Sequence, residues 1–285
     1  MKKRKTNKLI IVLLIVIFSI IIISGVLYLI YSLSGNYTKI EYVDNSYLNT
    51  DKDDVKDSNI IIINNIVLGA YKGNKWISGL NYYNLGDNKS DIEVDMFSEN
   101  KLLGTFKTAS LKRYNNSVIY TTIARNGMPE KYLALSSSNE FRIIPGMTKI
   151  DATKDDEKYV KEAIGSYKML NGSVNISEVY LTNINQTTDK IICATSKNSN
   201  MLGVYSAVIY VTENIPHIIK YAHVRNTKNA DLWPVYSLQF VMDINKDSKP
   251  EIILQETTGK TTSYEVLELR EDYNFYEVLK TTLEI

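Results

Sequence analysis

The first apolar segment of the chain is long and carries no charge. Residues 9–30 read LIIVLLIVIFSIIIISGVLYLI. As a helix rising about 1.5 Å per residue, this segment would span about 33 Å, close to the roughly 30 Å hydrocarbon core of a bilayer. Tyr28 and Tyr31 would then lie at the far membrane interface, where aromatic side chains are enriched. The pattern predicts a transmembrane helix over residues 9–31.

Positive charge is concentrated on one side of this segment. The first acidic residue is Glu41. Residues 1–8 contain the five basic residues Lys2, Lys3, Arg4, Lys5 and Lys8. Because cytoplasmic flanks of membrane helices are rich in lysine and arginine, residues 1–8 are predicted to be a cytoplasmic tail and the bulk of the chain extracytoplasmic.

A cleaved signal peptide ending near Ser34 is the alternative to a single-pass signal-anchor. The apolar core of a signal peptide is typically only about 7–15 residues long, which favours the uncleaved anchor. Under either interpretation, the rest of the protein is predicted to be exported.

Beyond the predicted membrane helix, a polar segment is followed by many short apolar runs. Residues 32–58 show no sustained apolar period and are predicted to be a solvated linker. From Asn59 onward, strand-like runs alternate with turn residues. Two of them, IIIINNIVLGAY and KWISGLNYY, flank the hairpin signal Gly73-Asn74. Many short strands of this kind predict a small all-β barrel or sandwich domain over residues 59–150.

One helical pattern interrupts the strands. Apolar side chains recur three and four positions apart from Tyr159 to Leu170, which gives one apolar face. Thr153 and Asp156 match a capping box, and Asn171-Gly172 supplies a stop signal. This helix is expected to begin a C-terminal β domain over residues 151–285, so the predicted fold class is mainly β.

Two segments that follow the helix are similar to each other. VYLTNINQTTDKIICATS (Val179 to Ser196) aligns with FVMDINKDSKPEIILQETT (Phe240 to Thr258) when one residue is deleted. A second strand-rich segment follows each copy. The alignment predicts two strand–loop–strand repeats with a period of about 60 residues, which would stack or pair to bury a shared core.

The loop of the second copy carries oxygen-bearing side chains at alternate positions. Such spacing lets several oxygens converge on one hard cation, so calcium is the predicted structural cofactor. The predicted ligands are the side chains of Asp243, Asn245, Asp247 and Glu251 and the backbone carbonyl of Lys249. The alternative is an Asx-rich turn that needs no ion. The first copy has Asn183, Asn185 and Thr187 with no carboxylate at those positions, which predicts a structural turn.

The second copy resembles a known class of extracellular repeat. Its D-x-N-x-D-x-x-P-E-I-I pattern, followed by a strand with Tyr264, is similar to the FG-GAP or VCBS type of repeat. In that family such loops bind calcium between strands of a propeller or sandwich. The resemblance covers about 100 residues, and it implies the same ligands: Asp243, Asn245, Asp247, Lys249 and Glu251. Ser248 departs from the family pattern, which usually has glycine there.

Composition excludes several classes of function. Beyond residues 1–8, 28 basic and 32 acidic residues remain, so no basic surface for nucleic acid is expected. Cys193 is the only cysteine, which precludes an internal disulfide. Only two histidines are present, His217 and His223, too few for most zinc-enzyme ligand sets.

Motifs that resemble catalytic signatures lack their required context. Gly259-Lys260-Thr261 resembles the end of a phosphate-binding loop, but the earlier glycine is replaced by Leu254. Ser98 and Lys101 fit the S-x-x-K pattern, but they lie between two predicted strands. No catalytic or cofactor-binding residue is therefore assigned.

The sequence thus predicts a membrane-anchored extracytoplasmic binding or scaffolding protein without catalytic activity. Its expected partners are the membrane, through residues 9–31, and cell-wall material or another exported protein. The alternative is an anchored surface hydrolase whose carboxylates, such as Asp231 or Glu256, assemble only in the fold.

Overall fold

The computed structural model describes most of the chain beyond residue 48. The described residues are 21–24, 42–43, 49–87, 90–99, 101–115, 118–123, 128–136, 147–165, 173–185, 188–197, 204–224, 233–270 and 273–284. The chain divides into two compact units, Met1–Tyr37 and Thr38–Ile285.

In the first unit, residues 21–24 are helical, and the side chains of Ile21, Ile22 and Ile23 are exposed. The rest of the predicted membrane segment, residues 9–31, lies outside the described residues. Within the described part of the chain, no helix has the length and hydrophobicity needed to cross a membrane.

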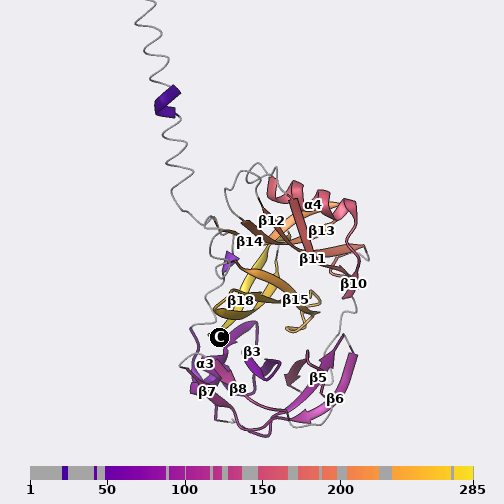
Figure 1. Ribbon diagram of the computed structural model, residues 1–285. Coiled ribbons are helices and arrows are strands. Elements are labelled where there is room, and N and C mark those ends of the chain that lie inside the picture. The colour runs from indigo at the N-terminus through magenta and orange to yellow at the C-terminus, as the bar shows by residue number, and fades with distance from the viewer. Residues whose placement is uncertain are drawn as a thin grey trace, which may run out of the picture. The chain divides into compact units, whose positions relative to one another are not determined.

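The second unit is mainly β, as predicted, and its described residues form three sheets (Figure 1). The N-terminal sheet has the strand order β6-β5-β9-β2-β3-β8-β7, with β4 paired to β3. Its strands are β2 (Asn59–Ile63), β3 (Ile66–Lys72), β4 (Lys75–Ser78), β5 (Glu93–Ser98), β6 (Lys101–Lys107), β7 (Lys112–Tyr114), β8 (Val118–Tyr120) and β9 (Leu133–Ser136).

Two five-stranded sheets, here called the first and second meander sheets, follow in the sequence. The first comprises β10 (Thr148–Ile150), β11 (Ser173–Thr182), β12 (Asp189–Lys197), β13 (Val204–Thr212) and β14 (Ile215–Val224). The second comprises β15 (Val235–Met242), β16 (Glu251–Thr257), β17 (Thr261–Leu269), β18 (Phe275–Glu284) and the short β1 (Tyr42–Val43), which pairs parallel to β18.

Each meander sheet contains a run of four long antiparallel strands, β11–β14 in one and β15–β18 in the other, and the short β10 adds antiparallel to β11. The first and the last strand of each run carry a register shift: near Ser177 and Ile219 in one sheet, and near Gln239 and Val278 in the other. The predicted strand–loop–strand pairs are thus present, and each continues into a hairpin.

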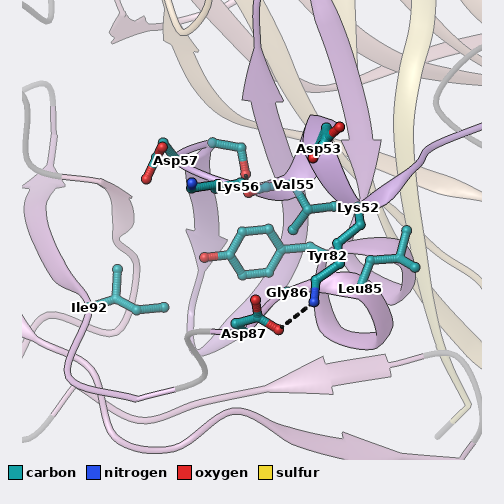
Figure 2. A pocket seen from close by; sticks show the side chains of 11 residues that line it. Lys52, Asp53, Val55, Lys56, Asp57, Tyr82, Leu85, Gly86, Asp87 and Ile92 are labelled. Carbon is teal, nitrogen blue, oxygen red and sulfur yellow. Dashed lines mark hydrogen bonds and ion pairs between the residues drawn. The ribbon is translucent and has the colours of Figure 1, made fainter.

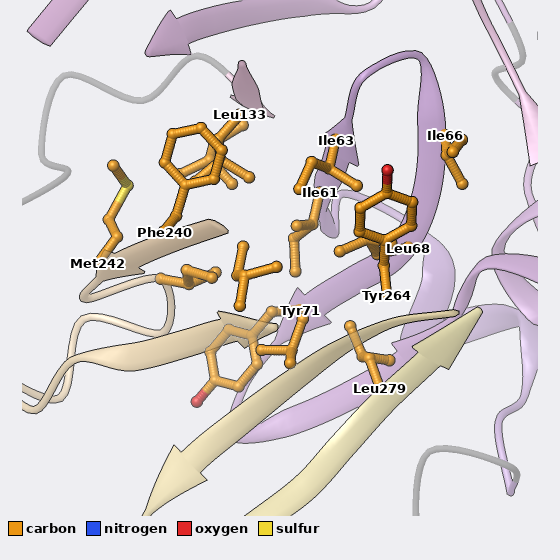
Figure 3. Close-up of a cluster of buried hydrophobic side chains, with 14 of the residues drawn as sticks. Ile61, Ile63, Ile66, Leu68, Tyr71, Leu133, Phe240, Met242, Tyr264 and Leu279 are labelled. Atoms are coloured by element: carbon orange, nitrogen blue, oxygen red, sulfur yellow. The ribbon is translucent and has the colours of Figure 1, made fainter. Parts of the chain in front are cut away.

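Both faces of the second meander sheet are buried against another sheet. Phe240 and Met242 pack toward Ile61, Ile63 and neighbouring residues of the N-terminal sheet (Figure 3). On the other face, residues such as Leu238 and Val241 pack against the first meander sheet. Leu238 and Phe240 face opposite ways because the bulge at Gln239 lies between them. Burial on both faces explains the continuous apolar runs of this region.

Helices cover the outer faces of the other two sheets. Helices α2 (Lys52–Val55) and α3 (Gly79–Leu85) contribute Val55 and Tyr82 to a cluster on the N-terminal sheet. Helix α4 (Lys154–Gly165) packs Val160, Ala163 and Ile164 onto the first meander sheet.

The N-terminus of α4 has the predicted capping box. The backbone N–H and hydroxyl of Thr153 donate to Asp156, at 2.8 and 2.7 Å, and the Thr153 hydroxyl accepts from the Asp156 N–H at 3.3 Å. The predicted stop at Asn171-Gly172 lies outside the described residues.

The prediction of one strand over KWISGLNYY was wrong. The strand ends at Ser78, whose hydroxyl accepts a hydrogen bond from the Asn81 N–H at 3.1 Å and so caps α3. The predicted hairpin turn at Gly73-Asn74 is confirmed, and both residues have positive φ angles.

Part of the expected linker packs on the N-terminal sheet. The ammonium of Lys72 donates to the carbonyl oxygens of Asp53 and Lys56, at 2.9 and 2.5 Å, and Val55 is buried. The predicted division into domains 59–150 and 151–285 stays a prediction, although one hydrophobic cluster includes residues of both.

Candidate functional site

The candidate site is the loop between β15 and β16. Lys246 and Ser248 adopt positive φ angles of 65° and 73°, which closes the loop tightly. Backbone N–H groups of the loop donate to its own side chains: Asp247 to Asn245 Oδ1 at 3.0 Å, and Lys249 to Asp247 Oδ1 at 2.8 Å. The polar side chains therefore shape the loop, as Asx turns do.

Two carboxylates lie fully buried at the base of the loop. Asp243 Oδ2 accepts from the Ser248 N–H at 3.0 Å. Glu251 Oε2 accepts from the N–H groups of Ile244 and Asn245, at 2.6 and 3.3 Å. The second oxygens, Asp243 Oδ1 and Glu251 Oε1, are buried and accept no hydrogen bond. One oxygen of each carboxylate is thus used by the loop, and the other is buried without a hydrogen bond.

Burial dominates the electrostatics of both carboxylates. It raises the pKa of Asp243, although hydrogen bonds from the Ser248 and Lys246 backbone act in the opposite direction. It raises the pKa of Glu251 well above its ordinary value, and the charges of Asp247 and Asp243 add to this effect. The negative charge is therefore poorly compensated by the protein.

The other predicted ligands are more exposed. Asn245 is half-buried, whereas Asp247 and Lys249 are exposed. The Oδ1 atoms of Asn245 and Asp247 accept hydrogen bonds from the loop backbone. Within the described residues, no group of three or more His, Cys, Asp or Glu side chains is placed to hold a metal ion. Among the predicted ligands, only Asp243 and Glu251 keep a buried carboxylate oxygen without a hydrogen bond.

Sequence reasoning missed the connection of this loop to the N-terminal sheet. Glu268 Oε1, on β17, accepts from Asn245 Nδ2 at 3.1 Å and from Trp76 Nε1 at 3.4 Å. Burial, followed by the charges of Glu268, Glu251 and Asp247, raises the pKa of Tyr71 to about 12. No local pattern marks these contacts, because Trp76 and Glu268 are 192 positions apart.

The corresponding loop of the first copy is closed by hydrogen bonds within the protein. Asp189 Oδ2 accepts from the Asn185 N–H at 2.7 Å and from the Tyr210 hydroxyl at 2.6 Å. Thr187 lies outside the described residues.

The remaining sequence candidates have structural surroundings. Cys193 is fully buried, and burial raises the pKa of its thiol. His223 stacks on Tyr205, with ring centroids 4.4 Å apart. Glu256 is half-buried in β16, opposite Tyr236 and Ser263, whereas Asp231 lies outside the described residues. Gly259 lies in the turn between β16 and β17.

A cavity of about 400 Å³ lies beside α2 and α3. Figure 2 shows the Tyr82 ring among its lining residues, with the ammonium of Lys52 paired to Asp87 at 3.2 Å. Both partners of that ion pair are largely exposed.

Comparison with known proteins gave no match to a family model, to a curated protein or to a solved structure.

Proposed function

We propose that this protein is a non-catalytic binding or scaffolding module, anchored in the cell membrane by residues 9–31 and lying mostly outside the cytoplasm. In this proposal the meander sheets are FG-GAP or VCBS-like repeats, and the partner is cell-wall material or another exported protein. One calcium ion in the β15–β16 loop stiffens the second repeat. The matching runs β11–β14 and β15–β18, each with a register shift in its first and last strand, support the assignment of repeats.

The observation that carries the proposal is the pair of buried, half-satisfied carboxylates. Asp243 and Glu251 each keep one oxygen without a hydrogen bond, and both side chains are fully buried. Leaving a buried anion uncompensated costs several kcal/mol. A divalent cation between the free oxygens would offset that cost, and carboxylate oxygens are the ligands that calcium prefers. Asn245 and Asp247 would complete the shell from the loop.

The same burial favours a structural role over catalysis. A general acid or base must approach the atom whose proton it transfers to within hydrogen-bond distance. The two carboxylates lie beneath a loop held by its own hydrogen bonds, where a polymeric substrate has no access. An ion held there acts on loop stability, and calcium affinity is expected in the weak extracellular class, with Kd of about 10⁻⁴–10⁻³ M.

Thermal unfolding of the full-length chain in detergent, with excess calcium or with chelator, tests this role. Calcium is expected to raise Tm, because an ion at about ten times its Kd adds about 1.4 kcal/mol to the free energy of unfolding. Asp243→Ala should abolish the response.

Glu251→Gln separates a cation site from a plain turn. In chelator, this substitution replaces a carboxyl that is costly to ionise in its buried position with a neutral amide, whose oxygen can still accept from the Ile244 N–H, so the variant should be more stable than wild type. In calcium, the order should reverse. The cation site would be refuted if the variant were more stable under both conditions and calcium did not change the Tm of the wild type.

A further inference from the structure

A second cavity, of about 640 Å³, lies where the three sheets meet. Its walls come from the β5–β6 turn, the segment before β9, and strands β10, β11 and β15. This volume falls within the range of about 300–1,000 Å³ that is usual for small-molecule sites. Three lysines, Lys101, Lys131 and Lys149, line it. The cavity shares no residue with the β15–β16 loop, so a ligand bound in it would be independent of the calcium proposal.

Lys131 is the half-buried cation of the cavity. Its Nζ donates to the Leu238 carbonyl at 2.8 Å and lies 5.8 Å from the centroid of the Phe240 ring. Among the described residues, no carboxylate lies within ion-pair distance of this ammonium. A carbonyl and an aromatic ring satisfy only part of its three-donor capacity. Burial lowers the pKa of Lys131, because the charged form is poorly solvated there, and Glu178 only partly counters this effect.

The acidic side chain whose charge acts on Lys131, Glu178, is already committed to other partners. Glu178 Oε2 accepts from the Leu238 N–H at 3.1 Å, and Oε1 accepts from the Tyr180 hydroxyl at 3.3 Å. Lys149 forms an ion pair with the same Oε1 at 3.4 Å. Glu178 therefore neutralises Lys149 and leaves the charge of Lys131 without a direct partner.

The rim of the cavity has mixed charge. Lys101, Glu99 and Glu130 are all exposed there, so water and salt screen them. The cavity beside α2 differs, because its lysine Lys52 pairs with Asp87 and its other lysine, Lys56, is exposed to solvent. Of these two cavities, the larger one therefore combines a half-buried lysine, Lys131, that has no carboxylate partner in the part of the chain that the structure describes, with space for a ligand beside it.

We propose that this cavity binds a small ligand through one carboxylate or phosphate group, which contacts the ammonium of Lys131. The backbone of the β15 strand and the Phe240 ring hold that ammonium in place. Lys101 adds a weaker attraction at the rim, and the body of the ligand occupies the remaining volume. An anion at this position completes the donor set of Lys131 with a charge-assisted hydrogen bond.

Isothermal titration of the full-length chain in detergent tests the proposal with two anionic probes, sodium D-glucuronate and glycerol 3-phosphate. Glucose and glycerol serve as their neutral counterparts. One anionic probe at least is expected to bind, and its neutral counterpart should not. A response to glucuronate alone assigns a carboxylate ligand, and a response to glycerol 3-phosphate alone assigns a phosphate ligand.

Variants then locate the bound anion. Lys131→Met keeps the apolar stem and removes the ammonium, so affinity should fall roughly tenfold, as expected for one charge-assisted hydrogen bond. Lys101→Met, at an exposed position, should weaken binding two- to threefold without affecting folding. Lys52→Met, in the other cavity, should leave affinity unchanged. The proposal is overturned if neither anion binds to wild type, or if Lys131→Met binds as tightly as Lys52→Met.

Discussion

At the scale of single residues, the most unusual feature of the interior is a cluster of buried ion pairs between the two meander sheets. Lys220 of β14 is 1% exposed and pairs with Glu265 at 2.6 Å and with Glu277 at 3.1 Å. Lys280 pairs with the other oxygen of Glu265 at 2.6 Å. Burial works to raise the pKa of Glu265, but the two lysines outweigh it and hold that pKa below its usual value.

Removing Lys220 should therefore strongly destabilise the protein. Lys220→Met leaves Glu265 and Glu277 buried beside a single remaining lysine, and breaking a buried pair in this way costs about 3–5 kcal/mol. Urea denaturation measures the loss. The control is Lys107→Met, because Lys107 is 65% exposed and lies 3.7 Å from Glu93 in a surface pair worth less than about 1 kcal/mol.

The dependence of stability on pH tests the same ion pairs in a second way. Because the folded-state pKa of Glu265 lies below its unfolded value, its contribution is fully present above the unfolded pKa of about 4.5 and is lost as pH falls through the folded pKa. A Lys220→Met variant that matches Lys107→Met in urea would show that the cluster contributes little.

At the scale of elements, local signals predicted the structure well. The Thr153 and Asp156 cap and the Gly73-Asn74 turn depend only on near neighbours, and the structure has both. Helix α3 was missed because Ser78 acts as a cap inside a run that reads as a strand. The hydrogen bonds of the candidate loop follow from its Asp and Asn spacing. The contact between Trp76 and Glu268 does not, because it depends on how two sheets pack.

Gly69 of β3 lies where the N-terminal sheet and the second meander sheet pack closely. A Cβ at this position would lie 2.2 Å from the Ile77 carbonyl oxygen and 2.9 Å from the methyl groups of Leu279. Gly69→Ala should therefore lower the free energy of unfolding by about 1–3 kcal/mol, as overpacking does, or by more because one contact is backbone.

Gly165, at the end of α4, provides the matched control for this substitution. A Cβ there meets nothing within 4 Å. Gly165→Ala should leave stability unchanged or raise it by up to about 1 kcal/mol, because alanine favours helix. Equal denaturation midpoints for the two variants would contradict the packing described for Gly69.

At the scale of the whole molecule, the second meander sheet joins the layers on either side of it. Its apolar side chains form one side of each of the two inter-sheet clusters. Detaching either neighbour would expose one face of the sheet to water. Although the sequence alone predicted two domains, residues 59–150 and 151–285, this packing favours unfolding of the three sheets together.

Scanning calorimetry of the full-length chain tests that cooperativity. A single transition is expected, with van't Hoff and calorimetric enthalpies that agree. Leu279→Ala truncates a fully buried side chain between two sheets. It should lower the free energy of unfolding by about 2–5 kcal/mol, and therefore Tm, while the protein still unfolds in one transition. Two resolved transitions in wild type would instead support the independent domains.

The hydrogen bonds of Glu268 also give the protein an optical reporter. The same carboxylate oxygen accepts from the indole of Trp76 and from the amide of Asn245 in the candidate loop. The chain has two tryptophans, so Trp233→Phe leaves Trp76 as the sole indole emitter. Any event that turns the Asn245 amide alters the polarity and hydrogen bonding of that indole. The emission wavelength and fluorescence lifetime of Trp76 can therefore report conformational changes of the loop in real time, without a dye attached to the protein.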